Sequence, residues 1–429
     1  LSDSTIFMAF YTIRHVIRDV EPEKLKPEFF DYVFSDTGTA EEVAEKTGID
    51  QGTVEEAHEQ FEYWYPLDYR TSAYPLIQNH LTFMLFHHTA LFDREDWPQG
   101  IATWGLGTLE GKKMSSSKGH VKLPDNAIQD YGADTTRFFI FASREPWQDF
   151  DWNEDDVQEY FNKIRSFYNR SKELYNSGEE REKTNLDRYA LSRLQKIKRK
   201  ATEGLEEFQT RKAGLNAFFE LNSLVNRYRD RSEKLNTEAA NELVETQVKL
   251  MSPFTPHICE ELWTEIGGEG FVSEAEWPEP EEELIDEDVE AAEELVDDVM
   301  SDIRELSDLV GDFEEIKVIV AGEEKRKLFS KMKQILDERP EFGEAMQQLI
   351  AETSSEPEEI ESYLKDHMNS PGKLPEKVFS QEKELEILSE ADAYLEEKFD
   401  SWIDIVTEAD SSSDKASRAE PGKPAIVME

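Results

Sequence analysis

Long helical periods dominate the middle of this chain and set the kind of core it can build. Between about residues 152 and 266, apolar side chains recur at the spacing of amphipathic helices. One such run covers residues 215–225 and another covers 243–251, where Pro253 and Pro256 end the second run. Helices of this kind joined by short connections pack as a bundle. The sequence therefore predicts an all-helical domain at residues 151–280.

The first 150 residues combine helix and strand signals. Residues 79–88 are apolar and long enough for a buried helix, and residues 100–105 are typical of a short buried strand. A loop rich in Gly and Ser follows at 107–122, and a helix is predicted to begin at Pro124. Strand, loop and helix in this order indicate an α/β domain over residues 1–150.

The last part of the chain predicts a small α+β domain at residues 281–429. Residues 281–300 hold eleven acids and no base, yet their apolar positions keep helical spacing. We therefore expect one solvated helix face rather than a disordered acidic tail. Strands are predicted at 316–320 and 402–406, with a possible third at 424–427.

Acidic residues outnumber basic ones, 95 against 48, which gives a formal net charge of −47. The acids are spread along the whole chain rather than gathered in one tail. Such a charge repels nucleic acid at low salt. In molar salt, the electrostatic interaction between charges is screened over a distance of about 3 Å. This pattern favours a protein adapted to high salt, such as one from a haloarchaeon. The hydrophobic fraction of 38% still provides enough material for a folded core.

Cysteine usage and hydropathy exclude several classes of protein. Cys259 is the only cysteine, which excludes a disulfide framework and a cysteine-rich zinc site. No apolar run approaches the roughly 20 residues of a membrane span, and no signal peptide is recognisable. We therefore expect a cytoplasmic protein without a membrane partner. The chain begins at Leu1 in what looks like an interior element, so we expect the natural N-terminus to lie elsewhere.

The loop at 107–122 gathers four lysines in this acidic chain, namely Lys112, Lys113, Lys118 and Lys122. A solvated surface turn is the simplest explanation for such a segment. The glycines at its ends and the hydroxyls at its centre instead favour a flexible loop that closes on an anion.

Residues 113–119, K-M-S-S-S-K-G, resemble the K-M-S-K-S loop of the class I aminoacyl-tRNA synthetases. Further segments are similar to leucyl-tRNA synthetases of the archaeal and eukaryotic type, and they extend the resemblance over the whole chain. These segments are Leu1–Ile6, Tyr65–Arg70, Asn79–Phe83, Gly107–Gly111, Gly132–Arg137, Phe150–Trp152, Ser252–His257 and Pro421–Ile426.

The resemblance implies a fold, substrates and site residues. The fold would be the C-terminal half of a Rossmann-type catalytic domain (1–150), a helical anticodon-binding domain (151–280) and an α+β tRNA-binding domain (281–429). The activity would be leucine activation with ATP and Mg²⁺, followed by transfer to tRNA(Leu); no resident metal site is implied. The family's H-I-G-H half and editing domain have no counterpart here. The catalytic positions would be Lys113, Ser116 and Lys118, and the ATP contacts Lys113, Met114, Ser115, Ser116 and Ser117.

The chain departs from the family at several positions in or near this site. Ser116 stands where the loop usually has its second lysine, and His120 replaces an Asn. Ala73 and Pro75 replace the Gly and Asp of the family's S-G-K-D-L stretch. Losing one aimed cation commonly costs about 10²–10³ in rate. Two alternatives therefore stay open: a catalytically silent paralogue that binds tRNA or a partner, and one subunit of a split enzyme completed by a separate N-terminal chain.

Five bases fall close together after the first strand of the last domain: Lys325, Arg326, Lys327, Lys331 and Lys333. Helical spacing predicts that they form a broad basic face for the RNA backbone. The alternative is that Glu323, Glu324 and Asp337 neutralise the cluster locally. The second basic run, 196–200, is predicted either to face tRNA or to pair with Glu203 and Glu207 on its own helix.

Other conspicuous side chains favour a structural role. His80, His87 and His88 lack a ligand pattern for a metal, so we interpret them as core or helix-surface residues. We likewise expect Trp147, Trp152 and Trp263 to pack inside the fold rather than to stack on nucleobases.

Overall fold

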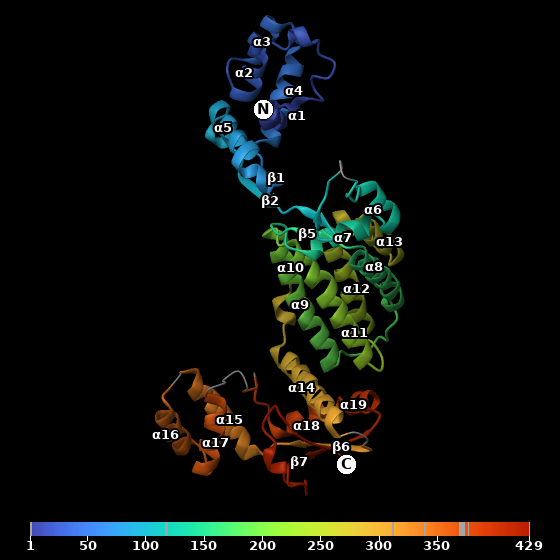
Figure 1. Ribbon diagram of the computed structural model, residues 1–429, viewed down its shortest axis with the longest axis vertical. Helices are drawn as coiled ribbons and strands as arrows, with labels where there is room; N and C mark the ends of the chain where they lie inside the picture. The colour runs from blue at the N-terminus through green and yellow to red at the C-terminus, as the bar shows by residue number, and fades with distance from the viewer. Residues whose placement is uncertain are drawn as a thin grey trace. The chain divides into compact units, whose positions relative to one another are not determined.

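The computed structural model describes residues 2–115, 119–310, 313–338, 340–368, 374–375 and 377–428. The chain divides into two compact units (Figure 1). Unit 1 comprises Leu1–Tyr168, Lys200–Leu215 and Met251–Cys259, and unit 2 comprises Asn169–Arg199, Asn216–Leu250 and Glu260–Glu429. The domain boundaries at residues 150 and 280 stay predictions.

Unit 1 begins with four helices around a buried apolar core that includes Ile13, Phe29, Val54 and Phe61. A two-stranded parallel sheet follows, in which Tyr69 pairs with Gly100 and Ala73 pairs with Trp104. The elements are α1 (Ser2–Ile13), α2 (Pro27–Ser35), α3 (Ala40–Thr47), α4 (Gln51–Trp64), β1 (Tyr69–Ala73), α5 (Thr82–Leu91) and β2 (Gly100–Trp104), with 3-10 turns at Pro22–Lys24, Tyr74–Leu76 and Arg94–Asp96 and a π-helical turn at Ile77–Leu81.

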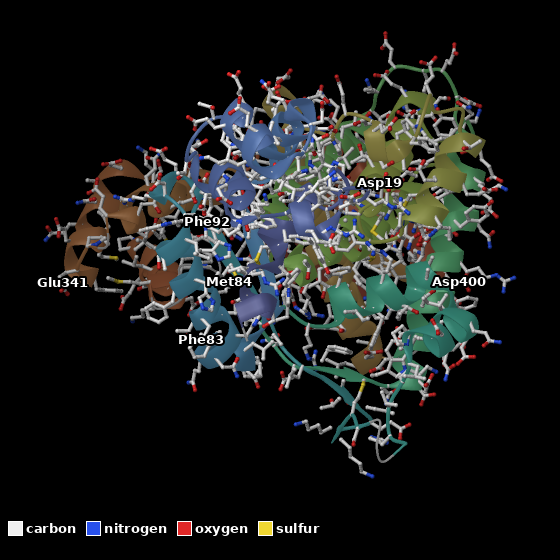
Figure 2. The ribbon with its side chains drawn as sticks, turned by 90° about the horizontal axis from the view of Figure 1, so that it is seen from above. Asp19, Phe83, Met84, Phe92, Glu341 and Asp400 are labelled. Atoms are coloured by element: carbon white, nitrogen blue, oxygen red, sulfur yellow. The ribbon has the colours of Figure 1, made fainter. Side chains whose placement is uncertain are left out.

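The prediction of a buried helix at 79–88 is half right. The segment is helical, but only Leu81, Met84 and His88 are buried within it. Phe83 (labelled in Figure 2) and Phe86 are exposed, whereas the covered side of α5 packs against α1.

The rest of unit 1 is built on a small mixed sheet whose strand order is β4-β3-β5. The short helix α10 packs against α7, and Gly214 on it lies so close to Ala142 that an added Cβ would meet that methyl group at 3.1 Å. The elements are β3 (Gly107–Leu109), β4 (Lys112–Lys113), α6 (Pro124–Tyr131), α7 (Ala133–Ser143), β5 (Phe150–Trp152) and α10 (Thr210–Gly214).

The predicted helical bundle is confirmed. Its helices are α8 (Glu154–Leu174), α9 (Asn185–Glu206), α11 (Leu221–Arg231), α12 (Thr237–Met251) and α13 (Pro256–Glu265), with a π-helical segment at Leu215–Glu220. Pro256 begins α13, where it replaces an amide that has no helical partner.

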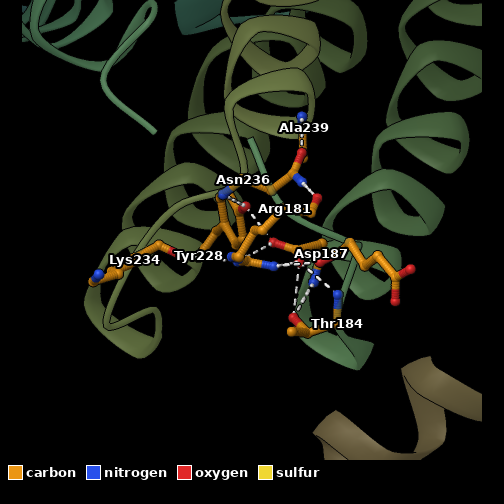
Figure 3. A network of polar contacts seen from close by, with 8 residues as sticks. Arg181, Thr184, Asp187, Tyr228, Lys234, Asn236 and Ala239 are labelled. Carbon is orange, nitrogen blue, oxygen red and sulfur yellow. Dashed lines mark hydrogen bonds and ion pairs between the residues drawn. The ribbon is translucent and has the colours of Figure 1, made fainter. Parts of the chain in front are cut away.

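A buried polar network fixes one end of the bundle in unit 2 (Figure 3). Asp187, which has no exposed surface, accepts hydrogen bonds from Arg181 (3.0 Å), from the Thr184 amide (2.7 Å) and from the Tyr228 hydroxyl (2.5 Å). Burial alone would raise the pKa of Asp187, but these hydrogen bonds hold it below its usual value. The network therefore joins α9, α11 and the two connections beside them through one ionised carboxylate.

The C-terminal part of unit 2 has the predicted strands, including the third. The strand order is β7-β6-β8, with β6 parallel to β7 and antiparallel to β8. The elements are α14 (Glu287–Val310), β6 (Glu315–Val320), α15 (Glu323–Asp337), α16 (Phe342–Glu352), α17 (Pro357–Met368), α18 (Gln381–Ser389), α19 (Asp392–Phe399), β7 (Trp402–Thr407) and β8 (Ala425–Met428), with 3-10 turns at Val272–Glu274, Glu282–Leu284 and Ala416–Arg418.

The acidic segment 281–300 follows its prediction except at one residue. It is helical from Glu287, most of its acids are exposed, and Val289, Val296 and Val299 are buried. Glu293, however, is only 9% exposed and is not part of a solvated face. Its carboxylate lies 2.8 Å from Arg227 and 2.8 Å from Arg231, both on α11. A carboxylate withdrawn from water needs such partners, and the bundle supplies them.

Candidate active-site loop

The lysine loop grows out of the β3–β4 hairpin, whose turn is fixed by a carboxylate. Glu110 and Gly111 both have positive φ, 48° and 73°. Asp151 on the neighbouring strand β5 accepts hydrogen bonds from the Thr108 hydroxyl (2.6 Å) and from the Gly111 amide (2.8 Å). These hydrogen bonds lower the pKa of Asp151 and keep it ionised at neutral pH. The turn before the loop is therefore held in one conformation.

Backbone pairing closes the base of the loop. The Ser115 amide donates to the His120 carbonyl at 2.7 Å, and the His120 amide donates back at 3.2 Å. The His120 ring adds a contact of 2.9 Å between Nε2 and the Leu109 carbonyl, so it ties the loop to β3. The predicted site residues Ser116, Ser117 and Lys118 lie between these two positions and outside the described residues.

Lys122 anchors the far end of the loop. Its ammonium lies 3.0 Å from Asp130 and 2.9 Å from Glu154. Glu154 also accepts hydrogen bonds from the Trp152 indole and the Tyr131 hydroxyl, and the second raises the pKa of Tyr131 to about 12. Two carboxylates therefore neutralise the charge of Lys122, which ties the end of the loop to α6 and to the next helix, α8.

The remaining predicted ATP contacts lie at the start of the loop. Lys113 is exposed on the edge strand β4, where it pairs with Thr108. The Met114 side chain packs against an apolar cluster that includes Ala127 and Trp152, so its side chain fixes the loop to the domain. The contacts of Lys113, Met114 and Ser115 with ATP stay predictions.

The two substituted positions of the nucleotide stretch lie where the parallel sheet ends. Ala73 is the last residue of β1 and pairs with Trp104, the last residue of β2. Pro75 occupies the 3-10 turn that follows. In open parallel sheets, ligands bind beyond the carboxyl ends of the strands, which is where both positions lie.

Sequence reasoning missed several residues that position this site. Asp151 and Glu154 received no role, although Phe150–Trp152 was among the segments that resemble the family. Gly105 was missed as well: an added Cβ there would lie 2.1 Å from the Gln148 carbonyl oxygen, so only glycine lets the two connections approach. Most of their partners lie 23 to 43 positions away, and local patterns carry no signal of such contacts.

The predicted basic face at 325–333 is wrong for two of its five residues. Lys325 is 8% exposed, and its ammonium binds Glu408 at 2.7 Å and two backbone carbonyls. Arg326 is 3% exposed and binds Glu384 at 2.6 Å. Both side chains lie on the covered side of α15, where acids from other elements neutralise them.

The other three lysines of this cluster are closer to solvent. Lys327 is exposed beside Glu324, and Lys331 is partly exposed beside Glu352. Lys333 is also partly exposed and donates to the Pro375 carbonyl at 3.1 Å. A contact between this cluster and tRNA stays a prediction. The side chains near enough to solvent to make it are Lys327, Lys331 and Lys333.

The second basic run does not pair along its own helix, and its contact with tRNA stays a prediction. Within unit 2, Lys196 binds Glu290 at 2.7 Å, Lys198 binds Glu242 at 2.9 Å, and Arg199 pairs with Glu282. The run therefore joins α9 to the acidic segment and to α12, instead of pairing along its own helix.

The three histidines are held by neighbours in the fold of unit 1. His88 is buried, with Tyr65 and the Met84 carbonyl as partners, and burial lowers its pKa. His87 contacts Thr5, and His80 contacts Arg70. Across the described residues, no group of three His, Cys, Asp or Glu side chains could hold a metal ion. Nor is any helix of the described part long and apolar enough to cross a membrane.

The tryptophans divide into two groups. Trp152 and Trp263 are buried, as expected for core residues, whereas Trp147 is 53% exposed. The prediction that Trp147 packs inside the fold is therefore wrong. This residue lies in the connection between α7 and β5.

Two protein families match parts of this chain. Residues 42–170 match the class I tRNA synthetases of the methionyl group, and residues 187–318 match the anticodon-binding domain of tRNA ligases. The leucine–tRNA ligase of Pyrococcus horikoshii is 40% identical over 447 residues, which cover 100% of this chain and 45% of that protein. The leucine–tRNA ligase of Methanothermobacter thermautotrophicus is 35% identical over 446 residues, which cover 100% of this chain and 46% of that protein.

The chain thus spans about half the length of the curated relatives it matches. Among solved structures, the complex of an Agrobacterium radiobacter leucyl-tRNA synthetase with tRNA superimposes with a TM-score of 0.46. The superposition covers 60% of this chain and 31% of that one at 19% identity.

Proposed function

We propose that this chain takes part in ATP-dependent leucine activation and in leucyl transfer to tRNA(Leu). The chain belongs to the class I aminoacyl-tRNA synthetases, and it is homologous along its whole length to leucine–tRNA ligases. The observation that carries the proposal is the lysine loop. It rises from a closed base between Ser115 and His120, with Lys113 exposed beside it.

The proposed chemistry needs positive charge more than covalent help. The leucine carboxylate attacks the α-phosphorus of ATP, leucyl-adenylate forms, and pyrophosphate leaves with the electrons of the broken bond. Negative charge grows on the leaving group, so cations fixed nearby lower the barrier. Lys113 and Lys118 are the proposed cations, with the hydroxyls of Ser115, Ser116 and Ser117 and the backbone of Met114 as further contacts.

Magnesium is proposed to arrive with ATP rather than to occupy a resident site. Mg²⁺ commonly keeps several waters and binds substrate phosphates with one or two carboxylates. Its part in the reaction would be to neutralise phosphate charge.

The tRNA is proposed to contact the C-terminal part of unit 2 through Lys327, Lys331 and Lys333. RNA backbone binding needs exposed cations and asks little of exact geometry. These three residues remain near solvent, whereas Lys325 and Arg326 are buried in ion pairs.

A second candidate function is tRNA binding without leucine activation. The substitutions at Ser116, Ala73 and Pro75 favour it, because they fall at the loop and at the end of the parallel sheet. The two candidates differ in one measurable property, the ability to exchange pyrophosphate into ATP in the presence of leucine.

The test compares the 429-residue chain alone with the chain plus the rest of a synthetase. We expect leucine-dependent ATP–pyrophosphate exchange at background for the chain alone, because ATP and leucine are not held in attack geometry. Adding the part of the Pyrococcus horikoshii enzyme that this chain does not match should restore exchange. Strong exchange by the chain alone would contradict the first expectation, and background exchange by the mixture would favour the tRNA-binding candidate.

A further inference from the structure

The C-terminal part of unit 2 contains a cavity for which the proposed function has no use. The cavity has a volume of about 510 Å³ and lies between α14 and the turn at 420–423, with α15 and α17 completing its wall. An apolar side of the wall includes Leu295, Phe329 and Phe379. The acids that line the cavity are Glu294, Asp298, Asp302 and Glu420. Such a wall favours a ligand that carries both apolar and cationic groups.

Two of these acids receive too little positive charge from the protein. Asp298 and Asp302 are four positions apart on α14, so their carboxylates are neighbours on one helix face. Burial raises the pKa of Asp298, and the charge of Asp302 raises it further. Burial also raises the pKa of Asp302, and Lys423 offsets this only in part. Lys377, the other lysine of the wall, pairs with Asp288. An external cation would therefore stabilise this pair of carboxylates.

The helix α17 adds a buried histidine to the same wall. His367 is 4% exposed, and its ring contacts Phe329 at 5.4 Å between centroids. Its Nδ1 has no hydrogen-bond partner among the described residues, and its Nε2 lies 3.6 Å from the Glu420 carboxylate. The carboxylate favours the tautomer with the hydrogen on Nε2, which makes Nδ1 an acceptor. A buried acceptor without a donor is costly, so this atom suits a ligand with an N–H group.

The turn that carries Glu420 is held in one conformation. Two backbone hydrogen bonds between Glu420 and Lys423, of 3.0 and 2.9 Å, close the turn. The Gly422 amide donates to the Glu384 carboxylate at 3.2 Å, and Glu384 is itself the buried partner of Arg326. This part of the wall is therefore formed before any ligand arrives, which lowers the entropic cost of binding.

We propose that this cavity binds a linear aliphatic polyamine. Asp298 and Asp302 would accept hydrogen bonds from one ammonium group. Glu420 and Nδ1 of His367 would accept hydrogen bonds from a second one. The methylene groups between them suit the apolar side of the wall, as the stems of lysine side chains do on other apolar surfaces. Nucleic acid does not suit this cavity, because its acids repel phosphate.

The test titrates the full 429-residue chain with spermidine by isothermal titration calorimetry. The solution contains about 1 M KCl, where charges are screened over about 3 Å, so that amines attracted only by the net charge of −47 do not stay bound. We expect one spermidine per chain with a dissociation constant below about 1 mM. 1-Aminobutane has a single ammonium group and should bind at least about 10-fold more weakly.

Two variants locate the site. Asp298→Asn, Asp302→Asn should weaken spermidine binding at least about 10-fold, because charge-assisted hydrogen bonds are lost. The matched control is Asp308→Asn, Glu344→Gln, which removes two charges from exposed residues outside the wall and should bind like the wild-type chain. His367→Phe keeps an aromatic ring beside Phe329 but removes the acceptor, so binding should weaken about 10-fold. Circular dichroism checks that each variant is folded.

Several results would overturn the proposal. One is the absence of binding by the wild-type chain at about 10 mM spermidine. Others are unchanged binding by the Asp298/Asp302 variant, an equal loss in the matched control, and equal binding of 1-aminobutane. Complete displacement of spermidine by an equal concentration of MgCl₂ would assign the site to an inorganic cation instead. None of these results bears on pyrophosphate exchange, because the cavity contains no residue of the lysine loop.

Discussion

The helices α5 and α14 reverse the usual relation between polarity and burial. α5 is rich in Phe and Leu, yet much of its surface is open to solvent in unit 1. α14 is rich in Asp and Glu, yet Glu293 in its second turn is 9% exposed and lies between two arginines of α11. What decides burial in each case is the partner: α14 has matching cations within unit 2, and α5 has only one covered side.

This contrast shows which of the charges in a chain with 95 acids contribute to the stability of the fold. Charges with buried partners hold the fold together, and their removal leaves an uncompensated ion. Charges and apolar groups that remain exposed contribute little to folding and are available to partners. The following predictions test this division, beginning with the largest effect.

Glu293→Gln should destabilise the chain most strongly. Arg231 would keep a buried guanidinium group without its carboxylate, whereas Arg227 would keep Asp297. Breaking a buried pair typically costs about 3–5 kcal/mol. Urea unfolding in molar KCl should show a loss in this range. Asp308→Asn, on the exposed end of the same helix, is the control and should change stability by less than about 0.5 kcal/mol. Equal stability of the two variants would show that the contact between α14 and α11 does not depend on charge.

Asp187 should make the free energy of unfolding decrease at low pH. Its pKa is lower in the folded chain than in the unfolded chain, where it is about 3.9. The stabilisation is therefore fully present above about pH 3.9 and is lost as pH falls through the folded pKa. Asp187→Asn should cost about 1–3 kcal/mol at pH 7, because buried donors lose an ionised acceptor.

The difference between wild type and Asp187→Asn should then stay constant down to about pH 4 and shrink as the pH is lowered further, from about 4 to about 2. Unfolding free energies from urea titrations at each pH measure it. A difference that stays constant over this range would show that the ionised carboxylate is not what stabilises the network in Figure 3.

The exposed lysines of α15 should affect tRNA binding and leave stability nearly unchanged. Replacing Lys327, Lys331 and Lys333 together with Gln should weaken tRNA(Leu) binding. The slope of log affinity against log salt should become shallower by roughly 0.7–0.9 for each phosphate that a lysine no longer neutralises. Lys317→Gln, on β6 beside Glu315 and Asp404, serves as a control outside the cluster. An unchanged affinity and slope in the triple variant would mean that the three lysines are only solvated.

Much of the fold was predictable because its signals are local. The spacing of apolar residues within 215–225 and 243–251 is enough to predict helices, and helices of that length with one apolar face must pack. Likewise, β6 and β7 are short apolar runs between polar segments, and both strands were found. The lysine loop was recognised from consecutive residues, 113–119, although its centre lies outside the described residues.

The errors share a cause, which is dependence on distant partners. Lys325 is buried because Glu408 lies opposite it, 83 positions away, and Arg326 is buried because of Glu384, 58 positions away. Glu293 was taken for a solvated residue because its arginines are 66 and 62 positions away. α5 was predicted to be buried from its composition, whereas burial depends on surfaces that composition does not reveal.

The most direct test of the proposed catalysis is Lys113→Ala in the chain combined with the unmatched part of the Pyrococcus horikoshii enzyme. Lys112 is the neighbouring exposed lysine on β4, and successive side chains of a strand point to opposite faces, so Lys112→Ala is the matched control. If Lys113 faces the leaving pyrophosphate, its variant should lose about 10²–10³ in the rate of leucine-dependent ATP–pyrophosphate exchange, and the control should lose little. Exchange by Lys113→Ala at the wild-type rate, or a loss that falls on Lys112→Ala instead, would contradict this assignment.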